Sequence, residues 1–128
     1  MVFSVDLAPG ADEHSVATAL ADLLRRSIEG HPRRARHLQS MRANVQVVAL
    51  DTGDALTLRF DLGRVTIHVG ALGLPAVTVA GPSELILGLP DRPLWELPGL
   101  IATGRLTVYG LAAHPRLVYR LARLVSRG

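Results

Sequence analysis

One short pattern, glycine-arginine-apolar-threonine-apolar, occurs twice in this chain and constrains its fold more than any other feature. The two copies span Gly63–Ile67 and Gly104–Val108. In each copy the glycine can adopt the positive φ of a tight turn, and the following residues alternate between aliphatic and polar side chains. Such alternation predicts a β-strand with one apolar and one polar face. The chain is therefore expected to build a sheet whose apolar face must be covered.

The same alternation continues in neighbouring segments and predicts five strands in all. They are expected at residues 44–51, 55–61, 64–69, 76–80 and 105–110. A tight hairpin at Asp61-Leu62-Gly63 should join the second strand to the third. In the third strand, Val65, Ile67 and Val69 are expected to face the core. The face expected to meet solvent carries Thr57, Arg59, Thr66, His68, Thr78, Thr107 and Tyr109.

Apolar residues at helical spacing predict helices before, between and after these strands. Helices are expected at residues 12–28 and 32–42, after Ser83, around residue 95 with an interruption at Pro98, and at residues 114–126. The order of elements indicates an α+β fold with a five-stranded, mainly antiparallel sheet and helices packed on one face. We expect a single domain over residues 1–128, with N-terminal helices at 12–42, the sheet and its helices at 44–110, and the terminal helix last.

Composition narrows the class of protein further. The chain has 128 residues, of which 48% are hydrophobic but only 4% aromatic, so its core must be mostly aliphatic. There is no cysteine, which excludes disulfides and thiol chemistry. The first residues lack the basic and apolar regions of a signal peptide, and the apolar stretch 72–89 is broken by prolines and polar residues. A cytoplasmic location is therefore expected.

Three stretches together resemble the sterol carrier protein 2-like (SCP2) lipid-binding domains. They are the hairpin Leu56–Thr66, the strand Val77–Gly81 followed by a Ser-Glu-Leu helix, and the strand Gly104–Gly110 followed by an amphipathic helix. The resemblance covers about residues 44–125. It implies a helix-covered sheet that encloses an apolar tunnel for a sterol, a fatty acyl chain or an isoprenoid-type ligand. It also implies carriage of that ligand without catalysis.

The resemblance further implies where such a ligand would lie, namely between the apolar sheet face and the helices. The residues expected to contact it are Leu58, Phe60, Ile67, Val79, Leu85, Leu89, Trp95, Leu100, Ile101, Leu106, Val108, Leu117 and Leu121. Trp95 could equally be an ordinary core residue. Two alternatives remain open: an interaction or accessory subunit whose core is filled and which docks through arginine-rich helices, and an accessory or catalytic domain acting on lipid-like substrates.

All fourteen basic residues, leaving histidine aside, are arginines, and four of them lie on one side of the terminal helix. Arg116, Arg120, Arg123 and Arg127 are spaced by four, three and four residues, which places them on one face opposite an aliphatic stripe. The ridge suits docking to anionic lipid headgroups or to an acidic protein partner, and a plain solvated helix face is the alternative. Nucleic acid is disfavoured, because the aromatic residues are scattered and form no stacking platform.

No catalytic, metal or cofactor site is predicted. The five histidines form no HxH or HxxxH pair, and no carboxylate stands at ligand spacing beside them. Neither Ser40 nor Ser83 lies in a nucleophile-elbow context, and no phosphate-binding glycine loop is present. We therefore expect a protein that is not an enzyme.

Overall fold

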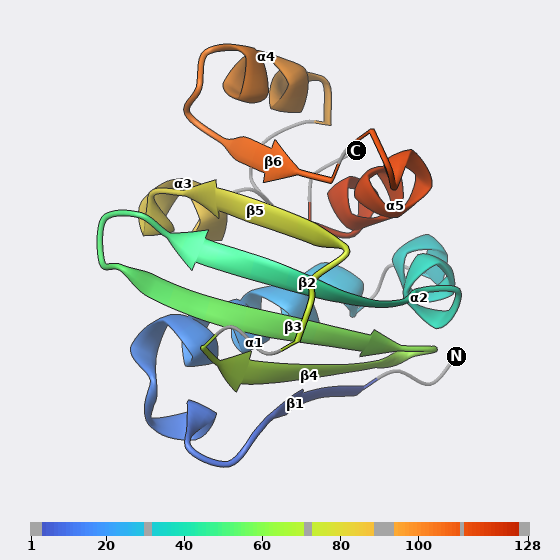
Figure 1. The fold of residues 1–128 in the computed structure, drawn as a ribbon. Helices are drawn as coiled ribbons and strands as arrows, with labels where there is room; N and C mark the ends of the chain where they lie inside the picture. Colours follow the sequence, from blue (N-terminus) through green and yellow to red (C-terminus); the bar gives the residue numbers. More distant parts are fainter. Residues whose placement is uncertain (1–3, 30–31, 71–72, 89–93, 111, 126–128) are drawn as a thin grey trace.

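The computed structural model describes residues 4–29, 32–70, 73–88, 94–110 and 112–125, and the following account concerns these residues (Figure 1). In chain order the elements are β1 (Ser4–Leu7), the 3-10 turn η1 (Ala11–Glu13), α1 (Ser15–Ile28), α2 (Pro32–Gln39), β2 (Arg42–Ala49), β3 (Asp54–Asp61), β4 (Arg64–Val69), β5 (Val77–Gly81), α3 (Ser83–Leu87), the 3-10 turn η3 (Leu94–Glu96), α4 (Leu97–Ala102), β6 (Thr107–Tyr109) and α5 (Pro115–Val125). The α+β class is confirmed.

The strands form one sheet in the order β1-β4-β3-β2-β5-β6. The pairs β2–β3, β3–β4 and β5–β6 are antiparallel, whereas β1–β4 and β2–β5 are parallel. The sheet thus has six strands rather than the five expected, because Ser4–Leu7 pairs with β4 at the sheet edge. The prediction of a mainly antiparallel sheet holds.

The hairpin between β3 and β4 has the two-residue turn that the sequence predicts. Leu62 has a φ of 47° and Gly63 a φ of 104°, so both central residues lie in the left-handed region. Two such residues match the right-handed twist of the flanking strands. The turn sets the register in which Leu58 pairs with Ile67 and Phe60 with Val65. All four side chains therefore point to the same face.

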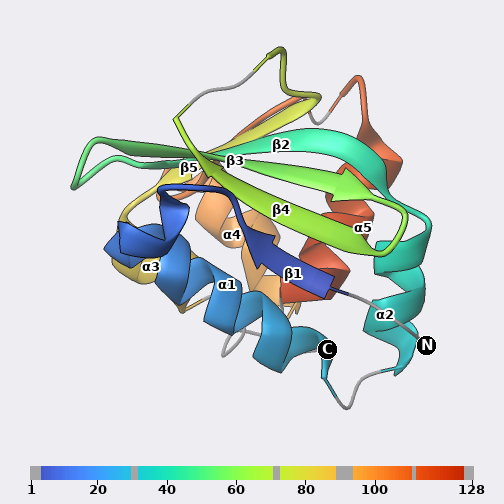
Figure 2. The ribbon, with the colours of Figure 1, turned by 90° about the horizontal axis from the view of Figure 1, so that it is seen from below.

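The helices cover this apolar face of the sheet (Figure 2). Its inward residues are almost completely buried: Val45, Val65 and Ile67 have no exposed surface, and Phe60 is 1% exposed. Helix α1 contributes Leu20, Leu23, Leu24 and Ile28 to the same cluster. Each fully buried aliphatic side chain contributes about 1.5–3 kcal/mol of transfer free energy. This layer holds the helices to the sheet.

Two positions of the sheet depart from the expectation, one on each face. Thr57 is 2% exposed, because the chain beyond β4 returns across the sheet and the carbonyl of Gly70 accepts a hydrogen bond from its hydroxyl at 2.8 Å. Val69 was expected to face the core but is 45% exposed. It is the last residue of β4, at the end of the covered area. The polar outer face is thus partly covered by the protein itself.

Candidate functional site

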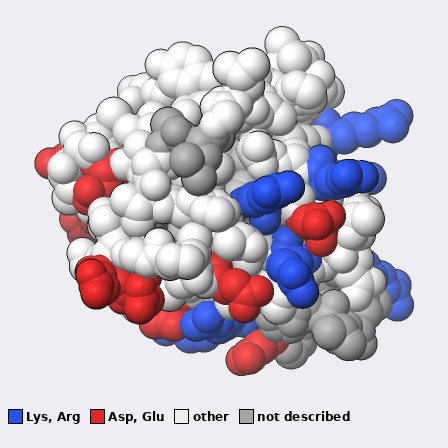
Figure 3. Space-filling view, turned by 60° about the horizontal axis from the view of Figure 1, so that its bottom comes forward, with Lys and Arg blue, Asp and Glu red and all other residues white. Residues whose placement is uncertain are grey.

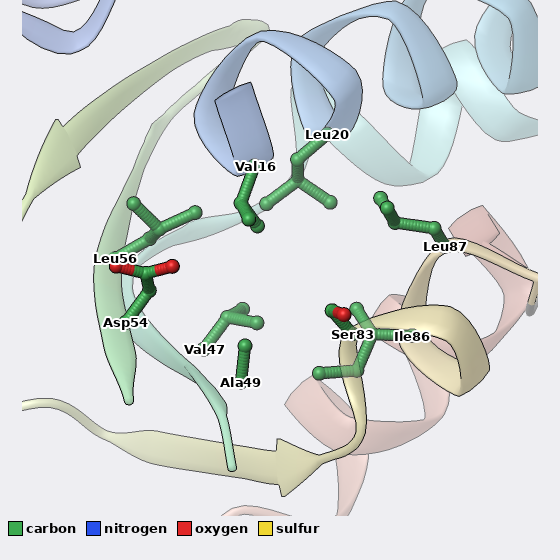
Figure 4. A pocket seen from close by; sticks show the side chains of 9 residues that line it. All are labelled: Val16, Leu20, Val47, Ala49, Asp54, Leu56, Ser83, Ile86 and Leu87. Atoms are coloured by element: carbon green, nitrogen blue, oxygen red, sulfur yellow. The ribbon is translucent and has the colours of Figure 1, made fainter. Parts of the chain in front are cut away.

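Over β2, β3 and β4 the space between sheet and helices is filled. The cavity found there has a volume of about 10 Å³, which is hardly enough for one water molecule (Figure 4). Figure 4 shows its lining side chains, among them Val16, Leu20 and Leu56, converging on this small space from α1, α3 and the sheet. At this place, between α1, α3 and the strands β2 and β3, the described side chains leave no room for a ligand. Aliphatic side chains occupy the space instead.

Over β5 and β6 the apolar layer divides into two clusters. The second cluster is built by Leu97 and Leu100 of α4 together with Leu106. Val79 and Val108 pack against both clusters, and both side chains remain partly exposed. They pair directly with each other across β5 and β6. We call the boundary formed by Val79 and Val108 the seam.

The structure divides the predicted ligand residues among these regions. Leu58, Phe60 and Ile67 are buried in the filled layer, where α5 adds Leu121 and half-buried Leu117. The residues at or beside the seam are Val79, Val108, Leu85, Leu100, Ile101 and Leu106. Leu89 lies outside the described residues. The predicted set is therefore spread over the buried layer and the region of the seam, where Val79 and Val108 remain partly exposed.

The side chain of Trp95 is 77% exposed, so the expectation of a core position is wrong. Trp95 lies in the 3-10 turn η3, and the helix itself begins only at Leu97. Of this segment, Leu97 and Leu100 face the second cluster. Trp95 is thus exposed, although Leu97 and Leu100 of the adjoining helix are buried.

The predicted arginine ridge is split by the packing of α5 against α2. Arg116 is exposed, whereas Arg120 is half-buried and its guanidinium donates a hydrogen bond to the carbonyl of Ser40 at 3.3 Å. Arg123 lies close to Arg34 of α2. Burial, and in addition the charge of Arg123, lowers the pKa of the Arg34 guanidinium. Arg127 lies outside the described residues.

A polar cluster forms where the β2–β3 turn meets the starts of α1 and α3, and the sequence did not predict that its members come together. Asp51 accepts two hydrogen bonds from Ser83, and the ring of His14 lies 3.1 Å from the carboxylate of Asp54. Hydrogen bonds from the backbone and side chain of Ser83 lower the pKa of Asp51. Hydrogen bonds from Thr52 and then His14 lower the pKa of Asp54. The sequence marked these carboxylates as turn residues but could not show which partners they meet.

The two carboxylates bind different partners, so this cluster is not a serine-histidine pair activated for nucleophilic attack. Ser83 is bound to a carboxylate, and His14 also accepts a hydrogen bond from the backbone N–H of Ala17 at the start of α1. Across the residues with described positions, no group of three or more metal-ligating side chains comes together. Nor is any helix among them long and apolar enough to cross a bilayer.

Comparison with known proteins relates this chain to others by structure. No protein-family model matches the sequence. No curated protein matches it either. The structure superposes on "UbiJ-SCP2 Ubiquinone synthesis protein" with a TM-score of 0.66 at 20% identity, covering 84% of this chain and 86% of the other. Sterol Carrier Protein 2 Like 2 from Aedes aegypti gives a TM-score of 0.53 at 16% identity, with 87% and 96% covered.

A third similar structure is the stereoselective inverting sec-alkylsulfatase Pisa1 from Pseudomonas sp., with a TM-score of 0.59 at 20% identity. The match covers 72% of this chain but 14% of the sulfatase, so the similarity concerns one part of a much larger enzyme. The chain has the SCP2-like fold.

Proposed function

We propose that this domain is a non-catalytic lipid-binding module of the cytoplasm that holds a sterol, fatty acyl or isoprenoid-type ligand at the seam. The observation that carries the proposal is the division of the apolar layer at Val79 and Val108. The likeness to Sterol Carrier Protein 2 Like 2 from Aedes aegypti supports the ligand class. The filled layer over β2–β4 supports a ligand position over β5 and β6 instead of a tunnel along the whole sheet.

The physical basis of binding would be apolar burial. Val79 and Val108 face each other across two strands, and a ligand lying over both would cover apolar surface that is now partly wet. Each Å² of apolar area removed from water contributes about 25 cal/mol. Cluster residues from α4 border one side of the seam, and half-buried Val118 of α5 belongs to the cluster on the other. A chain inserted between them would replace contacts across the seam with contacts to the ligand.

A second candidate function has its own supporting observation. The cavity of about 10 Å³ beneath α1 and α3 is what a protein without cargo would show. On that interpretation the domain is an accessory subunit whose solid core presents an arginine-rich surface to an acidic partner. The two candidates differ in whether an apolar ligand is bound at all.

Purification under native conditions followed by solvent extraction and mass spectrometry separates them. The lipid-binding proposal expects a co-purifying lipid, and saturable displacement of a fluorescent fatty acid from the refolded, delipidated protein. An empty extract together with no binding of the fluorescent fatty acid would exclude it and favour the accessory subunit.

A further inference from the structure

Several arginine side chains of the described surface meet at a groove at the start of α5. The groove has a volume of about 620 Å³ and is lined by Arg42, Arg116 and Arg120, with His114 beside them. No carboxylate lines it. Arg42 and Arg116 make no side-chain hydrogen bond or ion pair with the described part of the chain, although Asp61 lies opposite Arg42 in the neighbouring strand. The groove thus holds guanidinium groups that remain able to bind an anion.

The positive charge extends beyond the groove. Helix α2 packs against α5 and adds exposed Arg33 and Arg36 to this end of the molecule. On the face seen in Figure 3, most arginine side chains lie on one side and most carboxylates on the other, although one carboxylate lies among the arginines. Such separation produces an extended positive surface, which fits a broad anionic surface better than a single small anion.

An exposed leucine stands beside the groove. The side chain of Leu74 is 94% exposed, two residues before Ala76, which lines the groove. Gly110 lies directly against Ala76, because a Cβ on Gly110 would overlap the carbonyl oxygen of Ala76. In Figure 2 residues 73–76 and 112–114 rise on the outer side of the sheet. A fully exposed aliphatic side chain next to a basic groove is suited to enter a bilayer interface while arginines bind the headgroups.

We propose that the groove lined by Arg42, Arg116 and Arg120, together with Leu74, docks this domain on the surface of an anionic phospholipid bilayer. The inference goes beyond the proposed cargo site, since it concerns the groove at the start of α5 and not the seam. It also differs from the predicted ridge: Arg42 and His114 join the surface, and Arg123 turns toward α2.

Vesicle co-sedimentation tests the charged part. The wild-type chain is expected to sediment with phosphatidylcholine vesicles that contain phosphatidylserine, and to remain in solution with phosphatidylcholine alone. The double variant Arg42→Gln/Arg116→Gln should weaken partition about 30-fold, since each basic residue near such a surface contributes about a fivefold factor. The matched control is Arg105→Gln, an exposed arginine in a different groove, which should bind as wild type.

A labelled cysteine tests the apolar part. The chain has no native cysteine, so Leu74→Cys carries a single environment-sensitive fluorophore. Its emission should shift to the blue on anionic vesicles, while the label at Leu50→Cys, an exposed position on the β2–β3 turn, should not shift. Leu74→Ser should weaken partition about tenfold. Thermal unfolding of each variant verifies that it is folded.

Several outcomes would overturn the proposal. These are equal binding to neutral vesicles, an equal loss with Arg105→Gln, or a blue shift at residue 50 instead of residue 74. If inorganic phosphate bound in the groove while the chain did not bind vesicles, the ligand of the groove would be a soluble phosphate. Binding of an acidic protein without vesicle binding would show a protein partner. All these experiments can use delipidated protein, so a lack of vesicle binding would leave the cargo proposal unaffected. Equally, a lack of bound lipid would leave the docking proposal unaffected.

Discussion

The carboxylate of Asp51 caps helix α3 from a distant part of the chain. Its Oδ1 accepts a hydrogen bond from the backbone N–H of Ser83 at 2.8 Å, and its Oδ2 accepts one from the Ser83 hydroxyl at 2.7 Å. The residue at the N-cap position is Pro82, whose side chain makes no capping hydrogen bond. Asp51 therefore supplies from the β2–β3 turn the acceptor that the local sequence lacks.

Removing this acceptor should loosen α3. In Asp51→Asn the amide replaces one of the two acceptor oxygens with a donor, so the start of α3 should fray and the urea midpoint should fall. Amide hydrogen exchange should quicken at Ile86 and Leu87 more than in α1. Asp12→Asn, at an exposed carboxylate of η1, is the control. Equal exchange in both variants would show that α3 is held by its apolar contacts alone.

The free energy of unfolding should depend on pH through the carboxylates of Asp51 and Asp54. The pKa values of Asp51 and Asp54 are lowered in the folded protein, so their contribution to stability is complete above the ordinary carboxyl value of 3.8. It is lost as pH falls from that value through the folded pKa, because protonation breaks the hydrogen bonds that the carboxylates accept. Urea midpoints measured from about pH 6 down to about pH 2.5 should show this decline. The curve of Asp51→Asn/Asp54→Asn should be flatter across that range, and an unchanged curve would contradict the assignment.

Filling the seam should block the proposed ligand. In Val108→Phe the ring would occupy the apolar surface between the two clusters and should weaken fatty acid binding about tenfold, which corresponds to displacing about two methylene groups. Thr107→Phe places the same ring on the opposite face of β6 and should bind as wild type. Displacement titration with a fluorescent fatty acid measures both. Equal affinities would place the ligand elsewhere.

Gly110 should tolerate substitution less than Gly104. Both have positive φ, 90° and 76°, but a Cβ on Gly104 would meet no atom within 4 Å, whereas one on Gly110 would overlap the carbonyl oxygen of Ala76. Gly104→Ala should cost about 1 kcal/mol of unfolding free energy, and Gly110→Ala about 3 kcal/mol. Urea unfolding of the two variants compares them directly. Equal losses would show that the two loops separate easily.

Ser27 should be replaceable by alanine with a gain in stability. It is 5% exposed on α1, and its hydroxyl has no hydrogen-bond partner among the described atoms. Ser27→Ala removes an unsatisfied polar group and adds the better helix former, so the unfolding free energy should rise by about 1 kcal/mol. Thermal and urea unfolding measure this change. A loss of stability would mean that the hydroxyl is hydrogen-bonded in solution.

Features with a local physical cause could be predicted from the sequence. The alternation in β3 and β4 and the turn at Leu62-Gly63 predict the hairpin, since the period of two and the left-handed turn residues are decided within a few residues. The helical spacing from Val16 to Ile28 likewise predicts α1, because its apolar stripe is contained in one segment. The resemblance of the sequence to the SCP2 domains predicted the fold that the structure has.

Features that depend on distant partners could not be predicted. The four residues Ser4–Leu7 become a strand because β4 offers its free edge to them. Thr57 is buried where the chain after β4 bonds to it, and Trp95 is exposed although Leu97 and Leu100 close by are buried in the second cluster. In each case the pairing or burial of a residue depends on a distant part of the chain, which the local sequence does not reveal.

The sequence alone determined that one face of a sheet would be apolar and covered by helices, because side-chain alternation and helical spacing are properties of each segment. Only the tertiary structure decided how much space remains beneath the helices. That volume depends on how Leu20, Val47 and Leu56 pack around a space of about 10 Å³, and on the division of the core at Val79 and Val108. Small differences in the positions of whole helices decide between a filled layer and an open one, and they arise from the sum of all contacts.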